Sequence, residues 1–122
     1  MRIDKLVKAT VAALEDVKAR DIVVLDVKKM TSLFDKVIIA SADSSRQSKA
    51  LSNRVQEKLK ALGATIHGVE GEQVGEWVLV DLGAVVVHIM QPATRQYYNL
   101  EELWTPAGRS RRRRVGSARP AA

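Results

Sequence analysis

Strand-end aspartates are the residues of this chain whose chemical type could support catalysis. A small mixed sheet with closely spaced carboxylates can hold two metal ions for nucleotidyl transfer. Neither Asp26 nor Asp81 begins an Asp-x-Asp pair, and Asp43 follows Ser-Ala where that chemistry favours Gly-Ser. We therefore interpret such acids as hydrogen-bond acceptors at strand ends and predict that the protein is not an enzyme.

Metal and phosphate sites are equally sparse. His67 and His88 lie in predicted strands without the His-x-x-x-His or Glu-x-x-His spacing of a metal site. The chain contains no cysteine, which excludes a disulfide, a thiol nucleophile and a cysteine-bound metal. The glycines of residues 68–83 match neither the dinucleotide-binding fingerprint nor the phosphate-binding loop. We predict no catalytic residues, no metal and no cofactor.

The aromatic residues are concentrated in residues 77–104, which hold both tryptophans and both tyrosines of the chain. Such a cluster of rings favours a recognition surface, with acids that could meet a basic partner. Leu82 stands at a predicted hairpin tip with little core to reach, whereas we expect Trp104 to fasten the last helix to the sheet. The alternative is that all these rings only pack that helix. The candidate partner-binding residues are Glu70, Trp77, Asp81, Leu82, Tyr97, Tyr98 and Glu101.

The net charge of +6 belongs to the C-terminal segment. Residues 1–104 contain all 14 acids and 14 of the 20 Lys and Arg, so residues 105–122 contain six arginines and no acid. So polar a segment cannot offset its chain entropy by burial, and we predict a domain over 1–104 and a disordered tail over 105–122. The tail is either a solubilising extension or a contact to phosphates, namely those of ribosomal RNA. That contact would use Arg109, Arg111, Arg112, Arg113 and Arg114.

The predicted elements define the fold class. Apolar spacing of three and four residues predicts a helix over 3–20, and apolar runs predict buried strands over 22–25 and 36–41. Ser44 with Gln47 forms a capping box that begins a helix ending near Leu62, before Gly63. We predict a single α/β domain, in the α+β sense, with a mixed five-stranded sheet packed with helices. The other elements are a strand over 64–69, a hairpin over 77–80 and 85–90, and a last helix begun by Pro92.

The length and hydropathy of the chain indicate one small domain without a membrane-spanning segment. The 122 residues, 46% of them hydrophobic, can close one modest core. No apolar run approaches the ~20 residues that cross a bilayer, and the N-terminus lacks the apolar stretch of a signal peptide. We therefore predict a cytoplasmic protein without membrane contact.

Several segments, in their order and spacing, resemble one known family. They are DIVVLD at 21–26, FDKVIIAS at 34–41, SRQ at 45–47, GVEG at 68–71, WVLVD at 77–81, VVVH at 85–88 and RQYYNLEELW at 95–104. Together they are similar to the ribosomal silencing factor family, also called the RsfS or Iojap family. Two features depart from its pattern: an exposed Lys36 stands where an aromatic is more usual, and the arginine tail is not part of the family core.

The resemblance implies a fold similar to the nucleotidyltransferases but without their catalytic acids. It further implies a protein that binds the large ribosomal subunit through that subunit's fourteenth ribosomal protein. Bound there, such a protein blocks joining of the small subunit and represses translation when nutrients are short, and members form homodimers. The alternative hypothesis is an RNA-binding ribosome-assembly module that acts through the arginine-rich tail.

Overall fold

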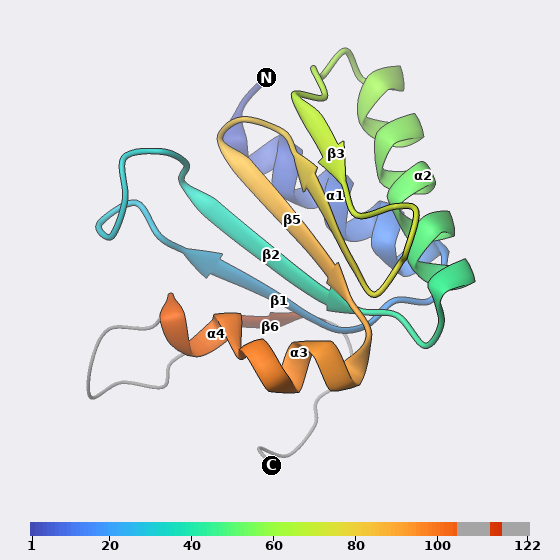
Figure 1. Ribbon diagram of the computed structural model, residues 1–122. Coiled ribbons are helices and arrows are strands. Elements are labelled where there is room, and N and C mark those ends of the chain that lie inside the picture. Colours follow the sequence, from blue (N-terminus) through green and yellow to red (C-terminus); the bar gives the residue numbers. More distant parts are fainter. Residues whose placement is uncertain (105–112, 116–122) are drawn as a thin grey trace.

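The computed structural model describes residues 1–104 and 113–115. Their strands form one sheet in the order β3-β4-β5-β2-β1-β6 (Figure 1). β2 and β5 pair in parallel, and every other pair of neighbours is antiparallel. The strands are β1 (Arg20–Asp26), β2 (Lys36–Ser41), β3 (Gly68–Glu70), β4 (Trp77–Asp81), β5 (Val85–Met90) and β6 (Arg113–Val115). The helices are α1 (Ile3–Asp16), α2 (Ser45–Ala61), α3 (Pro92–Tyr98) and α4 (Leu100–Leu103).

Helices α1 and α2 cover one face of the sheet and form the main core with it (Figure 1). Their buried side chains, such as Leu14 and Leu51, pack against sheet residues such as Ile38. The predicted capping box begins α2, because the Oγ of Ser44 accepts the backbone N–H of Gln47 at 3.1 Å. This face is therefore closed by two long helices.

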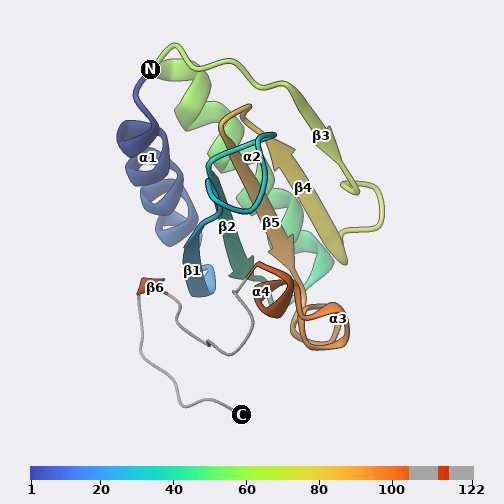
Figure 2. The same cartoon turned by 90° about the vertical axis from the view of Figure 1, so that its left-hand side faces the viewer.

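The opposite face carries a smaller core under α3 and α4. Val23, Val37 and Met90 are fully buried there, with Leu100 and Trp104 packed against them. The ring of Trp104 meets that of Phe34 edge to face, with centroids 5.5 Å apart, which confirms the predicted fastening of the last helix. In Figure 2 the two short helices lie together at the lower end of the sheet. Among residues 1–104, no helix lies over the part of this face near β3 and β4 (Figure 2).

The predicted fold class is confirmed, but several boundaries differ from the prediction. The first helix ends at Asp16 rather than at residue 20, because Lys18 adopts φ 64° and turns the chain into β1. The third strand spans Gly68–Glu70 instead of 64–69. The last helical stretch is divided at Asn99, whose φ of 47° interrupts the helix between α3 and α4.

The tail also departs from the prediction of disorder, because Arg113–Val115 forms β6 and pairs with the outer edge of β1. A sheet edge offers unpaired backbone groups to any extended segment, whatever its side chains. The tail positions Arg109, Arg111 and Arg112 lie outside the described residues. No helix in residues 1–104 is long and apolar enough to cross a membrane.

Candidate partner-binding face

Strand β4 has one buried side and one open side. Val78 and Val80 are fully buried toward α2, whereas Trp77, Leu79 and Asp81 alternate with them and stay partly exposed. The strand register places Glu70 beside Leu79, and Leu79 beside His88. Alternate residues of paired strands share one face, so these side chains line the uncovered part of the sheet. We call this surface the open face; it comprises Glu70, Trp77, Leu79, Asp81 and His88 with Tyr98 at its margin.

An aromatic cluster stands at the end of the open face next to α3. The rings of Trp77 and Tyr98 have centroids 4.8 Å apart, and Tyr97 meets Tyr98 edge to face at 4.9 Å. Tyr98 is 54% exposed and Tyr97 is 81% exposed. Neither tyrosine is buried. Rings that are held by one another yet reach solvent supply large apolar area to a partner at a low cost in side-chain entropy.

His88 supports Trp77 from the neighbouring strand. The indole Nε1–H of Trp77 donates to Nδ1 of His88 at 3.0 Å, and the ring centroids are 5.9 Å apart. Burial lowers the pKa of His88 from 6.5 to about 4, because the charged imidazolium would lose its hydration. His88 is therefore neutral at physiological pH, and its Nδ1 accepts the hydrogen bond from the indole N–H.

The open face belongs to an acidic part of the chain. Residues 68–104 contain six acids but a single Lys or Arg, namely Arg95, which is buried in an ion pair. Glu70, Glu76 and Glu102 are exposed in this part. The neutral sum over residues 1–104 therefore conceals an uneven distribution, with the excess of cations in residues 1–67. The open face carries the carboxylates of Glu70 and Asp81 and exposed rings but no Lys or Arg, which suits a basic protein rather than the phosphates of RNA.

Leu82 does not belong to the surface, although the sequence predicted that it binds a partner. It is 4% exposed and belongs to the main core, so its side chain points to the helix layer and not to the open face. The turn that follows it allows this inward position, since Gly83 adopts φ 88° and the Leu82 N–H donates to the Val85 carbonyl at 2.9 Å. A residue at a hairpin tip can thus belong to the core.

Glu101 was also predicted to bind a partner, but its side chain is buried in an ion pair. Its carboxylate and the guanidinium of Arg95 form two hydrogen bonds, Nε to Oε1 at 3.2 Å and Nη2 to Oε2 at 3.0 Å. Each of these two side chains is only 10% exposed. The Nη1 of Arg95 also donates to the Asp21 carbonyl at 2.7 Å and to the Ser41 Oγ at 2.8 Å. Glu101 therefore fastens α4 to α3 and to β1 and β2, and it does not present an acid to a partner.

The three aspartates that the sequence offered for catalysis serve local structure. The Oδ1 of Asp81 accepts the backbone N–H of Gly83 at 2.8 Å, and Asp43 pairs with Arg20. The backbone N–H of Lys28 and the ammonium of Lys36 lower the pKa of Asp26. Asp26 and Asp81 are thus hydrogen-bond acceptors at strand ends, as predicted. Within residues 1–104 and 113–115, no three His, Asp or Glu side chains are grouped as metal ligands.

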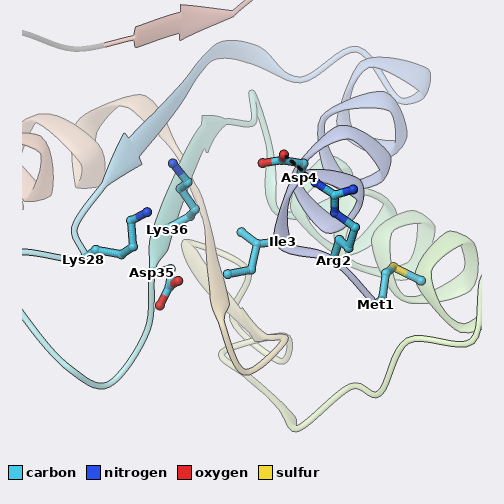
Figure 3. A pocket seen from close by; sticks show the side chains of 7 residues that line it. All are labelled: Met1, Arg2, Ile3, Asp4, Lys28, Asp35 and Lys36. Carbon is cyan, nitrogen blue, oxygen red and sulfur yellow. Dashed lines mark ion pairs between the residues drawn. The ribbon is translucent and has the colours of Figure 1, made fainter.

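A hollow of about 430 Å³ lies apart from the open face, at the start of α1. Figure 3 shows charges of both signs around it, with Arg2 paired to Asp4 at 3.9 Å. Lys36 also lines it and pairs with Asp26 at 3.3 Å; with a side chain 23% exposed, it is less exposed than the sequence analysis expected. None of the predicted partner-binding residues lines this hollow, so it does not extend the candidate site. Its lining is residues 1–4, Lys28, Asp35 and Lys36.

Sequence reasoning missed Leu79 and His88 as members of the face. The alternation of Trp77, Leu79 and Asp81 along β4 was a visible signal, because residues two apart share one side of a strand. His88 was interpreted as an ordinary strand histidine, and only the register of β4 with β5 places it between Trp77 and Leu79.

Comparison with known proteins supplies an independent line of argument. Residues 1–121 match the family model described as ribosomal silencing factor during starvation. The chain is 52% identical over 120 residues to the ribosomal silencing factor RsfS of Chromobacterium violaceum, covering 98% of this chain and 97% of that protein. A crystal structure of a Chromobacterium violaceum protein, also 52% identical, superposes with a TM-score of 0.85 over 98% of both chains. The chain is also 35% identical over 98 residues to a mouse protein named mitochondrial assembly of ribosomal large subunit protein 1, covering 78% of this chain and 43% of that protein.

Proposed function

Since the chain belongs to the ribosomal silencing factor family, we propose that it binds the large ribosomal subunit through that subunit's fourteenth ribosomal protein. Family membership itself implies association with the ribosome, and the family is not a class of enzymes. In this proposal the bound protein occupies the surface where the small subunit would join, and translation falls when nutrients are short. The protein would act in the cytoplasm, where bacterial ribosomes work.

The open face is the observation that carries the proposal. It combines exposed rings, Tyr98 and the partly exposed Trp77, with an acidic surrounding that contains no unpaired Lys or Arg in residues 68–104. Ribosomal proteins that contact RNA are rich in cations, so an acidic face favours encounter with one of them. The name of the mouse relative, which refers to the large subunit, supports the choice of subunit.

Blocking of subunit joining needs no chemistry. It requires one surface that binds and enough bulk behind it to exclude the other subunit. The open face would supply the first, and the layer of α1 and α2 on the opposite side of the sheet would supply the second (Figure 1). Contact of the arginine tail with ribosomal RNA and formation of a homodimer remain predictions beside this proposal.

Charge substitution at Tyr98 tests the proposal. Tyr98→Glu places a carboxylate where a ring would be desolvated against the partner, which should cost at least ~2 kcal/mol or roughly thirtyfold in affinity. Leu62→Glu is the matched control, since Leu62 is 43% exposed but lies at the end of α2, on the other side of the sheet. Both variants should melt close to the wild type.

The assay is co-sedimentation with purified large subunits, followed by joining of added small subunits. Wild type and Leu62→Glu should pellet with large subunits and prevent joining, and Tyr98→Glu should do neither. A folded Tyr98→Glu protein that still pellets and blocks joining would show that the docking surface lies elsewhere. A wild-type protein that does not bind large subunits at all would refute the proposed function.

A further inference from the structure

His88 occupies the middle of the open face. On the sheet surface it stands between Leu79 of β4 and Ile39 of β2, its cross-strand neighbours. Ile39 is fully buried beneath the short helices, whereas Leu79 and His88 are partly exposed. His88 therefore lies where the part of this face that the short helices cover meets the part that they leave open.

The contact with Trp77 fixes the tautomer of His88. An indole Nε1–H can only donate, so the Nδ1 that receives it at 3.0 Å must carry a lone pair. A neutral imidazole with an unprotonated Nδ1 carries its proton on Nε2. The indole thus decides which edge of the ring is a donor.

The donor edge of His88 has no partner of its own in the described chain. Within residues 1–104 and 113–115, no hydrogen bond reaches Nε2, and Nε2 is not among the buried polar atoms that lack one. It is therefore in contact with solvent at the surface of the open face. A partner that covers this face removes that water, and an unmatched donor would then weaken the complex.

We propose that the Nε2–H of His88 donates a hydrogen bond to a backbone carbonyl of the basic ribosomal protein, and that His88 thereby fixes the position of the partner on the open face. The inference rests on the proposed function and adds the atom that recognises the partner. A backbone carbonyl is the fitting acceptor, because the Lys and Arg side chains of a basic partner are donors only. A partner carboxylate would be repelled by nearby Glu70 and Asp81 and would meet no positive charge on a neutral ring.

Two substitutions separate the two edges of the imidazole. His88→Asn keeps an acceptor near the Nδ1 position for Trp77 but removes the donor at Nε2. His88→Gln places an amide donor near the Nε2 position but removes the acceptor for the indole. If the donor binds the partner, affinity for large subunits should fall by roughly tenfold to a hundredfold in His88→Asn and by only about threefold in His88→Gln. A role confined to holding Trp77 would give the reverse order.

Nitrogen NMR of the imidazole provides a readout that does not depend on the variants. In the free wild-type protein, Nδ1 of His88 should be unprotonated and Nε2 protonated. Addition of the purified fourteenth ribosomal protein should shift the Nε2–H resonance and slow its exchange with water. A proton on Nδ1, or an Nε2–H that exchanges equally fast in the complex, would overturn the inference even if a variant failed to fold.

The outcomes also separate this inference from the proposed function. If the wild type binds large subunits and His88→Asn binds within about threefold of it, the inference fails while the proposed function stands. If the wild type itself does not bind, both fail, and the wild-type measurement alone reveals this.

Discussion

Replacement of Glu101 by alanine should destabilise the protein strongly and affect ribosome binding only through that loss. The change leaves the guanidinium of Arg95 buried without its carboxylate, and breaking such a buried pair typically costs about 3–5 kcal/mol. Because Arg95 keeps the Asp21 carbonyl and the Ser41 hydroxyl as acceptors, we expect the lower end, about 3 kcal/mol. For a domain of this size that corresponds to a melting temperature lower by roughly 12–24 °C.

Urea unfolding followed by tryptophan fluorescence measures this loss, since Trp104 directly follows α4 and packs in the smaller core. Glu102→Ala is the matched control: it removes the neighbouring acid of the same helix, which is exposed, and should shift stability by less than about 0.5 kcal/mol. The reasoning fails if Glu101→Ala melts like the wild type and yet loses its affinity for large subunits. Glu101 would then be a recognition residue, as the sequence suggested.

Three further outcomes follow from the structure. Leu82→Ala should lower the free energy of unfolding, measured in urea, by about 2–4 kcal/mol, because the Leu82 side chain is buried in the core. A loss below about 0.5 kcal/mol would contradict that burial. Since the pKa of His88 falls from 6.5 to about 4 on folding, the unfolded chain binds more protons between those values. The free energy of unfolding of the wild type should therefore drop as pH falls from 6.5 to 4, by up to about 3 kcal/mol more than that of His88→Asn. Urea unfolding at several pH values measures both proteins, and an equal pH dependence of the two would contradict this. Truncation after Thr105 should keep the sheet of β1 to β5 folded. Because it removes six arginines, it should also flatten the dependence of large-subunit affinity on salt concentration. An unchanged salt dependence would exclude a phosphate contact by the tail.

The sequence predicted the elements whose signals are local. The continuous apolar run of β1 indicated burial on both faces, and Val23 and Val24 are indeed buried on opposite sides of the sheet. The hydroxyl of Ser44 and the side chain of Gln47 lie within one turn of each other and began α2 where expected. Such features depend on a few neighbouring residues, and so they can be predicted from the order of residue types alone.

The exact helix ends were less predictable. Nothing in the apolar spacing of residues 3–20 indicated that Lys18 would adopt a left-handed conformation and end the helix early. Likewise, β6 forms through backbone groups that arginines share with every other residue except proline, so its side chains gave no sign of it. In both cases the rest of the fold, and not local preference, decides the conformation.

By itself the sequence determined the α+β class, the family, and the concentration of aromatic rings and acids in residues 68–104. Only the tertiary structure decided which of those residues reach the surface. Leu82 turns inward over the helix layer, Glu101 is enclosed with Arg95, and His88 comes beside Trp77 through strand pairing. The physical reason is that burial and hydrogen-bond partners are set by residues distant in the chain, here 11 to 74 positions apart, which no local pattern records.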